Sequence, residues 1–283
     1  MSTVALFVHG GRDDALQTGR LMAAWLLDHG HVPVADGTGP MELVGDGVEV
    51  DDRTQPVDLV IAIGGDGTML RATKRAVEAS AHVFGVNLGH LGYLADVEVG
   101  GWEAALERYF QGDFVITERL LVASQVWPPG GGPVNIPSGL NEVVIEKQDL
   151  SRTVQVAIAI DGQHFTTYVA DGVIIATPTG STAYSLSARG PVVAPTHRAL
   201  LFTAVSPHSL FDRSLVLEPT STVEVSILGD RAAAVAVDGE QIQALEPGSR
   251  VTVTSDERPA RFVTFSDRNF HQILKAKFGL NTR

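Results

Sequence analysis

The sequence of 283 residues contains no cysteine, which excludes disulfide bonds, zinc sites with thiolate ligands and cysteine nucleophiles. It also contains no apolar run of about 18 residues, so we expect no transmembrane helix. Residues 1–10 lack a basic region followed by a long apolar stretch, so a secretory signal is not expected. These absences favour a cytoplasmic protein that does not contact a membrane.

Runs of lysine and arginine are also missing, and the formal net charge is −12. A general nucleic-acid-binding protein normally has a basic face, so no nucleic-acid partner is predicted. An acidic protein that binds a phosphorylated ligand must do so locally, through backbone N–H groups, a few arginines or a cation. The hydrophobic fraction of 44% is ordinary for a globular protein of one or two domains.

The most informative segment reads Gly64-Gly65-Asp66-Gly67-Thr68 and directly follows the apolar run 59–63. Glycines let backbone N–H groups approach a ligand, and the start of the helix that we expect over 69–79 favours phosphate. An aspartate repels phosphate unless it holds a metal ion or takes a proton, which indicates phosphoryl transfer. The segment has neither the lysine of a P-loop nor the spacing of a dinucleotide fingerprint. The alternative is a tight turn in which Asp66 caps the helix.

Strand and helix signals alternate over residues 1–115, which predicts an α/β domain with a parallel sheet and helices on its faces. We interpret the polar, glycine-rich segment 36–56 as a mobile loop or a short insertion, not a metal cluster. The expected strands are 4–8, 59–63 and 82–86, and the expected helices are 13–29, 69–79 and 102–110.

Short β-branched runs dominate residues 116–265 and predict an antiparallel, β-rich, sandwich-like domain. Asp161-Gly162 and Asp238-Gly239 are read as turns, and 127–137 as a loop. A helical period over 267–278 predicts that residues 266–283 form a helix that returns to the first domain. The expected strands are 154–160, 172–176, 200–205, 222–227, 234–237 and 251–254.

Two further segments suit a nucleoside. The segment 177–185 combines small hydroxyl residues with one tyrosine, a set that fits a flat ring and sugar hydroxyls. The alternative is a turn in which Ser181 caps a short helix. Asn141-Glu142 stands at the start of an apolar strand, where an amide and a carboxylate can read a base edge and a ribose diol. The alternative is a solvated strand end.

Together these segments resemble the bacterial NAD kinase family, the ATP- or polyphosphate-dependent enzymes that make NADP from NAD. The glycine turn alone is shared with diacylglycerol kinases and 6-phosphofructokinases, but the full set is far more specific and covers nearly the whole chain. The matching segments are Gly64 to Thr68, Asn87 to Leu94, Asn141-Glu142, Asp171-Gly172, Thr177 to Ser185 and Pro207 to Leu210.

The resemblance implies that Asp66 accepts the proton of the adenosine 2′-hydroxyl of NAD. Gly64, Gly65, Gly67 and Thr68 would bind the phosphate donor. Mg²⁺ or another divalent cation would be held mainly through the phosphates, so no protein metal ligands are predicted. The substrate-binding residues that the resemblance implies are Gly67, Arg71, Asn141, Glu142, Arg152, Val169, Asp171, Thr182, Ala183, Tyr184, Ser185, Leu186, Ser187 and Glu240.

Some positions depart from the family's usual residues. Val169 stands where many members have arginine, which leaves the preference for NAD or NADH open. Arg189 replaces a usual glycine, and Glu240 a frequent glutamine. Arg152 matches a position that can reach the ligand of a neighbouring subunit, which implies a homodimer or homotetramer. From the sequence pattern alone, without the family resemblance, we would interpret Arg152 as an exposed strand residue.

Other functions remain to be distinguished. A lipid or sugar kinase could share the glycine turn, although the segment 177–185 and the lack of a membrane-binding stretch argue against a lipid substrate. An NADH-accepting kinase of the same family and a non-catalytic NAD(P)-binding regulator are further alternatives. The presence of Asp66 argues against the regulator, and a panel of substrates separates all of these functions.

Overall fold

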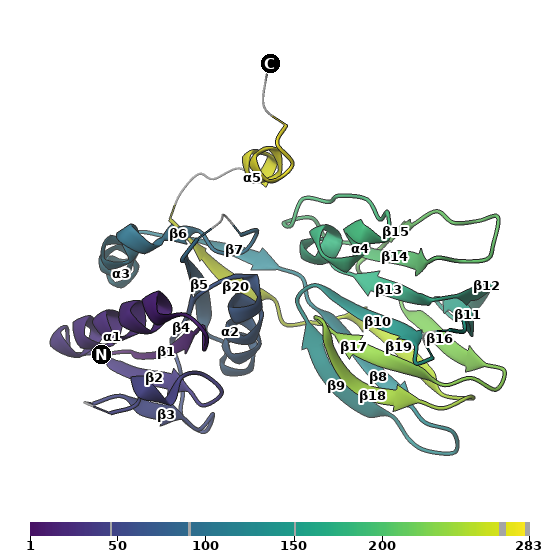
Figure 1. Cartoon of the computed structure of the whole chain (residues 1–283), viewed down its shortest axis with the longest axis horizontal. Helices are drawn as coiled ribbons and strands as arrows, with labels where there is room; N and C mark the ends of the chain where they lie inside the picture. The colour runs from purple at the N-terminus through teal and green to yellow at the C-terminus, as the bar shows by residue number, and fades with distance from the viewer. Residues whose placement is uncertain (46, 90–91, 150, 266–269, 281–283) are drawn as a thin grey trace. The chain divides into compact units, whose positions relative to one another are not determined.

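The computed structural model describes residues 1–45, 47–89, 92–149, 151–265 and 270–280. His90 and Leu91 of the predicted motif, and residues 266–269 and 281–283 of the expected C-terminal segment, lie outside the described residues. The chain divides into two compact units (Figure 1): Met1–Glu118 with Ala260–Arg283, and Arg119–Pro259.

The first unit is built on an eight-stranded sheet in the order β3-β2-β1-β4-β5-β20-β7, with β6 paired to β5. Pairing from β3 through to β20 is parallel, as the alternation of strands and helices predicts. The strands are β1 (Thr3–Val8), β2 (Val32–Asp36), β3 (Glu49–Asp51), β4 (Leu59–Ile63), β5 (His82–Asn87), β6 (Val97–Glu98), β7 (Val115–Arg119) and β20 (Ala260–Thr264). The helices are α1 (Asp13–Asp28), α2 (Asp66–Ala79), α3 (Trp102–Gln111), α5 (Phe270–Lys277) and the 3-10 turns η1 (Met41–Leu43) and η2 (Val99–Gly101).

Helices cover both faces of this sheet. Alternate residues of β1 and β4, such as Leu6 and Ile61, share one apolar cluster with α1 and α3. On the other face α2 packs so closely that a Cβ at Gly85 of β5 would lie 2.9 Å from the sulfur of Met69. Burial on both faces explains why these strands are continuous apolar runs, without the alternation of a half-exposed strand.

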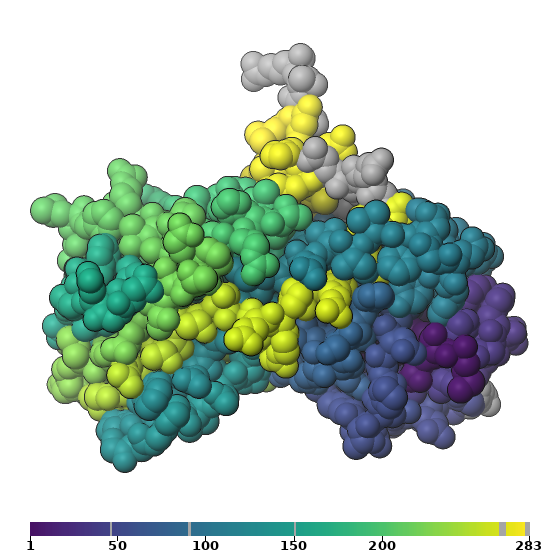
Figure 2. All heavy atoms as spheres, turned by 180° about the vertical axis from the view of Figure 1, so that it is seen from behind, coloured from purple at the N-terminus to yellow at the C-terminus, as the bar shows by residue number. Residues whose placement is uncertain are grey.

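The end of the chain contributes to the first unit. β20 pairs with β5, and its yellow atoms lie next to the blue atoms of this unit in Figure 2. β20 therefore belongs to the parallel sheet, although it falls within the range 116–265 that we expected for the β-rich domain. Farther along, the Lys277 ammonium of α5 lies 4.5 Å from the centre of the Tyr93 ring.

Two expectations for the first unit were wrong in detail. Helix α2 begins at Asp66 instead of residue 69, because Gly65 adopts an extended conformation and an acidic residue is favourable in the first turn. The segment 36–56 is not simply a loop, since it contains η1 and the edge strand β3, which pairs with β2. The predicted strands 4–8, 59–63 and 82–86 and helices 13–29 and 102–110 are confirmed, with ends shifted by one residue or less. Of the helix expected over 267–278, the described part is α5 (Phe270–Lys277).

The second unit is a sandwich of two antiparallel six-stranded sheets, which confirms the predicted class. One sheet has the order β15-β14-β13-β10-β17-β18 and the other β12-β11-β16-β19-β8-β9, and their inner faces share one core. The strands are β8 (Val122–Trp127), β9 (Val134–Gly139), β10 (Glu142–Lys147), β11 (Val154–Ile160), β12 (Gln163–Ala170), β13 (Gly172–Ala176), β14 (Leu200–Val205), β15 (Leu215–Leu217), β16 (Val223–Leu228), β17 (Ala233–Val237), β18 (Glu240–Leu245) and β19 (Arg250–Ser255).

Both predicted Asp-Gly turns connect adjacent strands. Asp161 and Gly162 have φ of 50° and 76°, and Asp238 and Gly239 have φ of 50° and 82°. Two successive positive φ values give the turn whose twist suits a two-residue hairpin. The expected loop 127–137 was wrong at its ends, because β8 runs to Trp127 and β9 begins at Val134.

The outer face of the β10-containing sheet is partly covered by the segment that follows β13. This segment contains η3 (Thr179–Thr182) and the short helix α4 (Tyr184–Ser187). Ala188 and Val193 pack on a small cluster that includes Val144 and Ile174, on the face away from the main core. The hydroxyl-rich residues 177–187 are thereby held against the end of β10 where Asn141 and Glu142 lie. Among the described residues, no helix is long and apolar enough to cross a membrane.

Candidate active site

The turn after β4 is shaped by its glycines. A Cβ at Gly64 would lie 2.6 Å from the Thr68 hydroxyl and 3.1 Å from the Cβ of His9, so any side chain there would force these loops apart. Gly65 and Gly67 face open space and are exposed. The first N–H groups of α2 are therefore accessible, and the start of the helix attracts an anion.

Asp66 begins α2 with a carboxylate that is only half satisfied. Its Oδ2 accepts a hydrogen bond from the Tyr93 N–H at 3.4 Å, whereas Oδ1 is buried without a partner among the described residues. Gly92 lies so close that a Cβ there would clash with Oδ1. Burial, and then the negative charge of Asp66, raise the pKa of the Tyr93 hydroxyl. A buried carboxylate oxygen without a donor is costly, and it indicates a role in binding or catalysis.

Asp66 stands next to the switch point of the sheet. From β1 the chain passes through α1 to β2 on one side, and from β4 it passes through α2 to β5 on the other, so the two connections diverge between β1 and β4. Ligands of open α/β sheets bind in the crevice at this point, beyond the carboxyl ends of the strands. The loops after both strands lie here, and the His9 N–H bonds to the Ile63 carbonyl at 3.0 Å.

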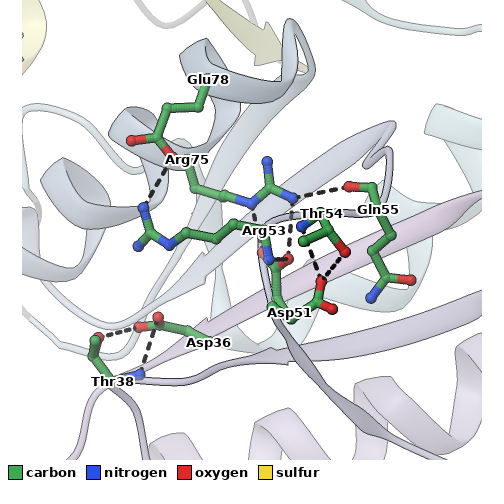
Figure 3. A network of polar contacts seen from close by, with 9 residues as sticks. Asp36, Thr38, Asp51, Arg53, Thr54, Gln55, Arg75 and Glu78 are labelled. Atoms are coloured by element: carbon green, nitrogen blue, oxygen red, sulfur yellow. Dashed lines mark hydrogen bonds and ion pairs between the residues drawn. The ribbon is translucent and has the colours of Figure 1, made fainter.

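Arg71, one turn into α2, is oriented by the end of β2. Its Nη1 donates to Asp36 Oδ2 and to the Thr38 hydroxyl, both at 2.8 Å. Thr38 in turn donates to Asp36 Oδ2 at 2.7 Å (Figure 3). The Asp36 carboxylate is buried, while the Arg71 side chain keeps 40% of its surface exposed. Arg71 is thus held at the carboxyl edge with part of its guanidinium free for a ligand.

In the second unit, one carboxylate organises the backbone before β10. Asp238 Oδ1 accepts the N–H groups of Asn141 at 2.7 Å and Glu142 at 3.1 Å, and Oδ2 accepts that of Leu140 at 2.7 Å. The Asn141 carbonyl receives the Thr177 N–H at 2.8 Å. These bonds use the backbone of Asn141, and its side-chain amide has no hydrogen bond to any described residue.

Glu142 is buried, and its Oε2 has no hydrogen-bond partner among the described residues. Burial, with the nearby charge of Asp238, raises the pKa of this carboxyl to about 8, although the Tyr184 N–H favours the charged form. At neutral pH the side chain is therefore largely protonated and can donate a hydrogen bond as well as accept one. Such a group is suited to a sugar hydroxyl.

The Glu142→Gln variant is expected to remove a pH dependence of stability. Because the folded pKa lies above the ordinary value, the unfolded chain releases this proton first, and stability falls as pH rises from about 4.5 to about 8. The free energy of unfolding of the wild type should therefore drop by several kcal/mol across this window, at about 1.4 kcal/mol per pH unit. Denaturant titrations between pH 5 and 8 should show a flatter profile for the variant.

The exposed Glu246 in the same unit provides the matched control, since Glu246→Gln should leave the profile of the wild type unchanged. Equal slopes for the wild type and Glu142→Gln would show that the Glu142 carboxyl is already ionised at pH 5 in the folded protein.

The segment 177–187 divides into structural and available hydroxyl groups. Thr177 donates to the Leu140 carbonyl at 2.5 Å, and Ser181 exchanges hydrogen bonds with the backbone of Val193. Gly180 packs on the Asn141 carbonyl so tightly that a Cβ would overlap it. Ser185 is buried, and its hydroxyl has no hydrogen-bond partner among the described residues, whereas Tyr184 is 38% exposed. Ser181 is therefore structural, and Tyr184 is the aromatic ring that a ligand can contact.

Arg189 follows α4 with φ of 66°, a conformation that favours glycine. We expect Arg189→Gly to raise the free energy of unfolding by about 0.5–1 kcal/mol, because the left-handed region costs a residue with a Cβ about 1–2 kcal/mol. Neighbouring Ala188 has φ of −85°, so Ala188→Gly should lower the free energy of unfolding instead. Urea titrations of both variants check this sign reversal, and a loss of stability in Arg189→Gly would show that the arginine side chain makes a stabilising contact.

The remaining predicted residues occupy separate places in the second unit. Asp171 precedes β13 and forms an ion pair of 2.6 Å with Lys147 of β10. Val169 lies on the edge strand β12, where it is 37% exposed. Arg152 is exposed beside Asp149 at 3.8 Å, and Glu240 begins β18 as an exposed residue. Thr182, Ala183, Leu186 and Ser187 lie in or next to η3 and α4 and are exposed or half-buried.

Three residues at these sites were not singled out from the sequence. His9 and Arg12 lie in the loop after β1, and Lys147 pairs with Asp171. The pair Gly10-Gly11 directly after an apolar strand was a signal for the first two. Lys147 gave no local signal, because its partner is 24 residues away and is reached only through the β10–β13 pairing. No group of three or more histidine, aspartate or glutamate residues suited to a metal occurs among the described residues.

Two family models match the chain. The ATP-NAD kinase N-terminal domain matches residues 4–114, and the ATP-NAD kinase C-terminal domain matches residues 140–265. Both matches, with the glycine-aspartate turn at the switch point, define a phosphotransferase. The chain belongs to the ATP-NAD kinase family.

Relatives and solved structures agree with this assignment. Proteins named NAD kinase from Heliobacterium modesticaldum (39% identical over 98% of each chain) and Syntrophotalea carbinolica (32% over the full length of both) are similar to this chain. Another from Corynebacterium glutamicum is 40% identical over 81% of this chain and 79% of its own. A yeast NADH kinase complexed with NADH shares the fold at a TM-score of 0.90 and 21% identity, covering 100% of this chain and 89% of its own. An NAD kinase from Archaeoglobus fulgidus in complex with ATP has a TM-score of 0.73 at 22% identity, over all of both chains.

Proposed function

We propose that this protein transfers the terminal phosphoryl group of ATP to the 2′-hydroxyl of the adenosine ribose of NAD, giving NADP and ADP. The observation that carries the proposal is the buried Oδ1 of Asp66, which has no partner in the described part of the chain and lies beside accessible helix N–H groups. Asp66 takes the hydroxyl proton as the ribose oxygen bonds to phosphorus and the bond to ADP breaks. General-base catalysis of this kind is worth about 10²–10⁴-fold.

Positioning and charge neutralisation of the donor should supply more of the acceleration than proton transfer. Gly64, Gly65, Gly67 and Thr68 shape the donor site, and Arg71 adds positive charge at the same edge. No group of three or more candidate metal ligands occurs among the described residues, so a Mg²⁺ ion would take most of its ligands from phosphates and water. The ion would neutralise charge on the donor.

Recognition of NAD is assigned to the second unit. The protonated Glu142 carboxyl and the free amide of Asn141 suit a ribose diol and an adenine edge, and Tyr184 offers its ring. The Asp171 carboxylate, which the ion pair with Lys147 holds in place, suits the nicotinamide carboxamide. Thr182, Ala183, Ser185, Leu186 and Ser187 would line the pocket, with Val169 and Glu240 farther out.

A donor-by-acceptor matrix tests the function. Purified protein with Mg²⁺ is offered ATP, other nucleotides or polyphosphate against NAD and NADH, and 2′-phosphorylated product is measured. We expect NADP from ATP and NAD. The reactions with polyphosphate show which donors the protein accepts, and the reactions with NADH show whether the chain with Val169 prefers NAD or NADH. NADP binding without product in any column would support a non-catalytic regulator instead. Phosphorylation of a lipid or sugar in its place would identify a different kinase.

The assembly is proposed to be a homodimer or homotetramer. The exposed side chain of Arg152, paired to Asp149 only at 3.8 Å, is free to reach a neighbouring copy. Light scattering at assay concentrations measures the mass, and a monomer would overturn this proposal without affecting the proposed reaction.

A further inference from the structure

Arg12 occupies a central position that the proposed reaction does not yet use. It follows β1 and directly precedes helix α1, in an extended conformation. Its Nη2 donates to the Leu88 carbonyl at 2.6 Å, and its Nε and Nη2 bind the Asp14 carboxylate at 3.0 and 2.6 Å. The side chain is therefore held through its Nε and Nη2.

The sheet order shows where the Arg12 guanidinium lies. Arg12 comes after β1 and Leu88 comes after β5, and β4 lies between these two strands. The bond from Arg12 to Leu88 thus spans the carboxyl end of β4, where the turn Gly64-Gly65 begins. The guanidinium therefore lies at the same carboxyl edge as the exposed glycines at the start of α2.

Part of this guanidinium is free. Its Nη1 makes no hydrogen bond to any residue that the structure describes, and the Arg12 side chain is 42% exposed. Nη1 lies next to Gly89, where a Cβ would stand 3.5 Å away, so no side chain at that position shields it. Asp14 offsets one charge but leaves the Nη1 donors unoccupied.

An acidic chain needs such a group in order to hold a polyphosphate. The net charge is −12, so the long-range field of the protein repels ATP and attraction must come from cations in the crevice. Arg71, on α2, is held at the end of β2 through Asp36, and Arg12, in the loop after β1, reaches the Leu88 carbonyl that follows β5. Both arginines therefore lie at the carboxyl edge of the sheet, where the glycine turn begins.

We propose that Arg12 is a donor-binding residue, whose Nη1 donates to the phosphate chain of ATP while Leu88 and Asp14 hold its orientation. The inference rests on the proposed function and adds a residue to the donor site. A planar guanidinium with a fixed orientation binds phosphate oxygens better than a lysine ammonium does.

The test compares Arg12→Ala and Arg12→Lys with the control Arg20→Ala. Arg20 lies on α1, the helix that Arg12 precedes, and it is exposed and donates to the Glu42 carbonyl at 3.2 Å. Its removal changes the net charge by the same amount. Loss of a charge-assisted hydrogen bond should raise the KM for ATP about 10- to 100-fold in Arg12→Ala, with a smaller rise in Arg12→Lys. The KM for NAD should not change in any variant. Arg20→Ala should match the wild type for both substrates.

Binding of tripolyphosphate, measured by calorimetry without NAD, separates a phosphate contact from a structural effect. The dissociation constant should rise by a similar factor in Arg12→Ala and stay constant in Arg20→Ala. If Arg12→Ala does not fold, as judged by circular dichroism, Arg12→Lys carries the comparison. Unchanged tripolyphosphate binding, or equal rises in the KM for ATP and NAD, would overturn the inference. A wild type that binds tripolyphosphate but forms no NADP would instead overturn the proposed function.

Discussion

Asp66→Asn is expected to reduce the rate of NADP formation by at least about 10²–10⁴-fold while leaving the protein folded. Asparagine keeps the shape of the side chain and can accept the Tyr93 N–H through its amide oxygen, but it cannot take the proton of a ribose hydroxyl. The wild-type carboxylate carries a buried Oδ1 without a partner among the residues that the structure describes, so removal of its charge also removes a desolvation penalty. The melting temperature should therefore stay constant or rise.

The control for this experiment is Asp13→Asn. Asp13 is also an acidic residue in the first turn of a helix, so its replacement loses a similar interaction with the helix dipole but touches no proposed ligand. Initial rates with ATP and NAD, thermal melts and NAD binding should be measured for both variants. Asp66→Asn activity within tenfold of the wild type would exclude Asp66 as the base. A large fall in melting temperature would show that the carboxylate is mainly structural.

The sequence predicted those parts of the fold and site that depend on local pattern. The apolar run 59–63 and its glycine turn identified β4 and the presence of α2, although not its first residue, because strand burial and backbone access both follow from residue type. Asp161-Gly162 and Asp238-Gly239 identified hairpins for the same reason. The family resemblance then supplied roles for Asn141 and Glu142 that their local sequence left open.

Features that depend on distant partners were not predictable in this way. Nothing around Asp238 indicates that its carboxylate holds three N–H groups near residue 141, since the contact arises from β10 and β17 being paired. β20 resembles the strands of the sandwich in composition but joins the parallel sheet by pairing with β5. Asp51 reads as one more acid in a polar segment, yet it is buried against Arg75.

Replacement of Arg75 is expected to lower the free energy of unfolding of the first unit strongly, because its charge is buried against Asp51. Arg75 of α2 and Asp51 of β3 are both almost completely buried, and the Arg75 Nε and Nη2 contact the two Asp51 oxygens at 2.5 and 3.0 Å. Arg75 Nη2 also donates to the Gln55 carbonyl at 3.2 Å (Figure 3). Arg75→Met leaves a buried, unpaired carboxylate, so the unit should lose about 3–5 kcal/mol, which lowers its melting temperature by roughly 10 °C.

A second replacement distinguishes the unpaired charge from lost packing. The double variant Asp51→Leu with Arg75→Met removes both charges, so most of the lost stability should return, because a buried pair gains little over an apolar pair of similar size. The adjacent exposed pair of Arg53 and Glu78, at 2.9 Å, serves as the control (Figure 3). Arg53→Met should cost less than about 1 kcal/mol. Calorimetric melts of the wild type, Arg75→Met, the double variant and Arg53→Met provide the measurement. If the double variant is no more stable than Arg75→Met, charge pairing does not hold α2 to β3. The hydrogen bond to Gln55 and side-chain packing would then be responsible. Since α2 carries Asp66 and Arg71, kinase activity near the melting temperature should fall in the same order as stability.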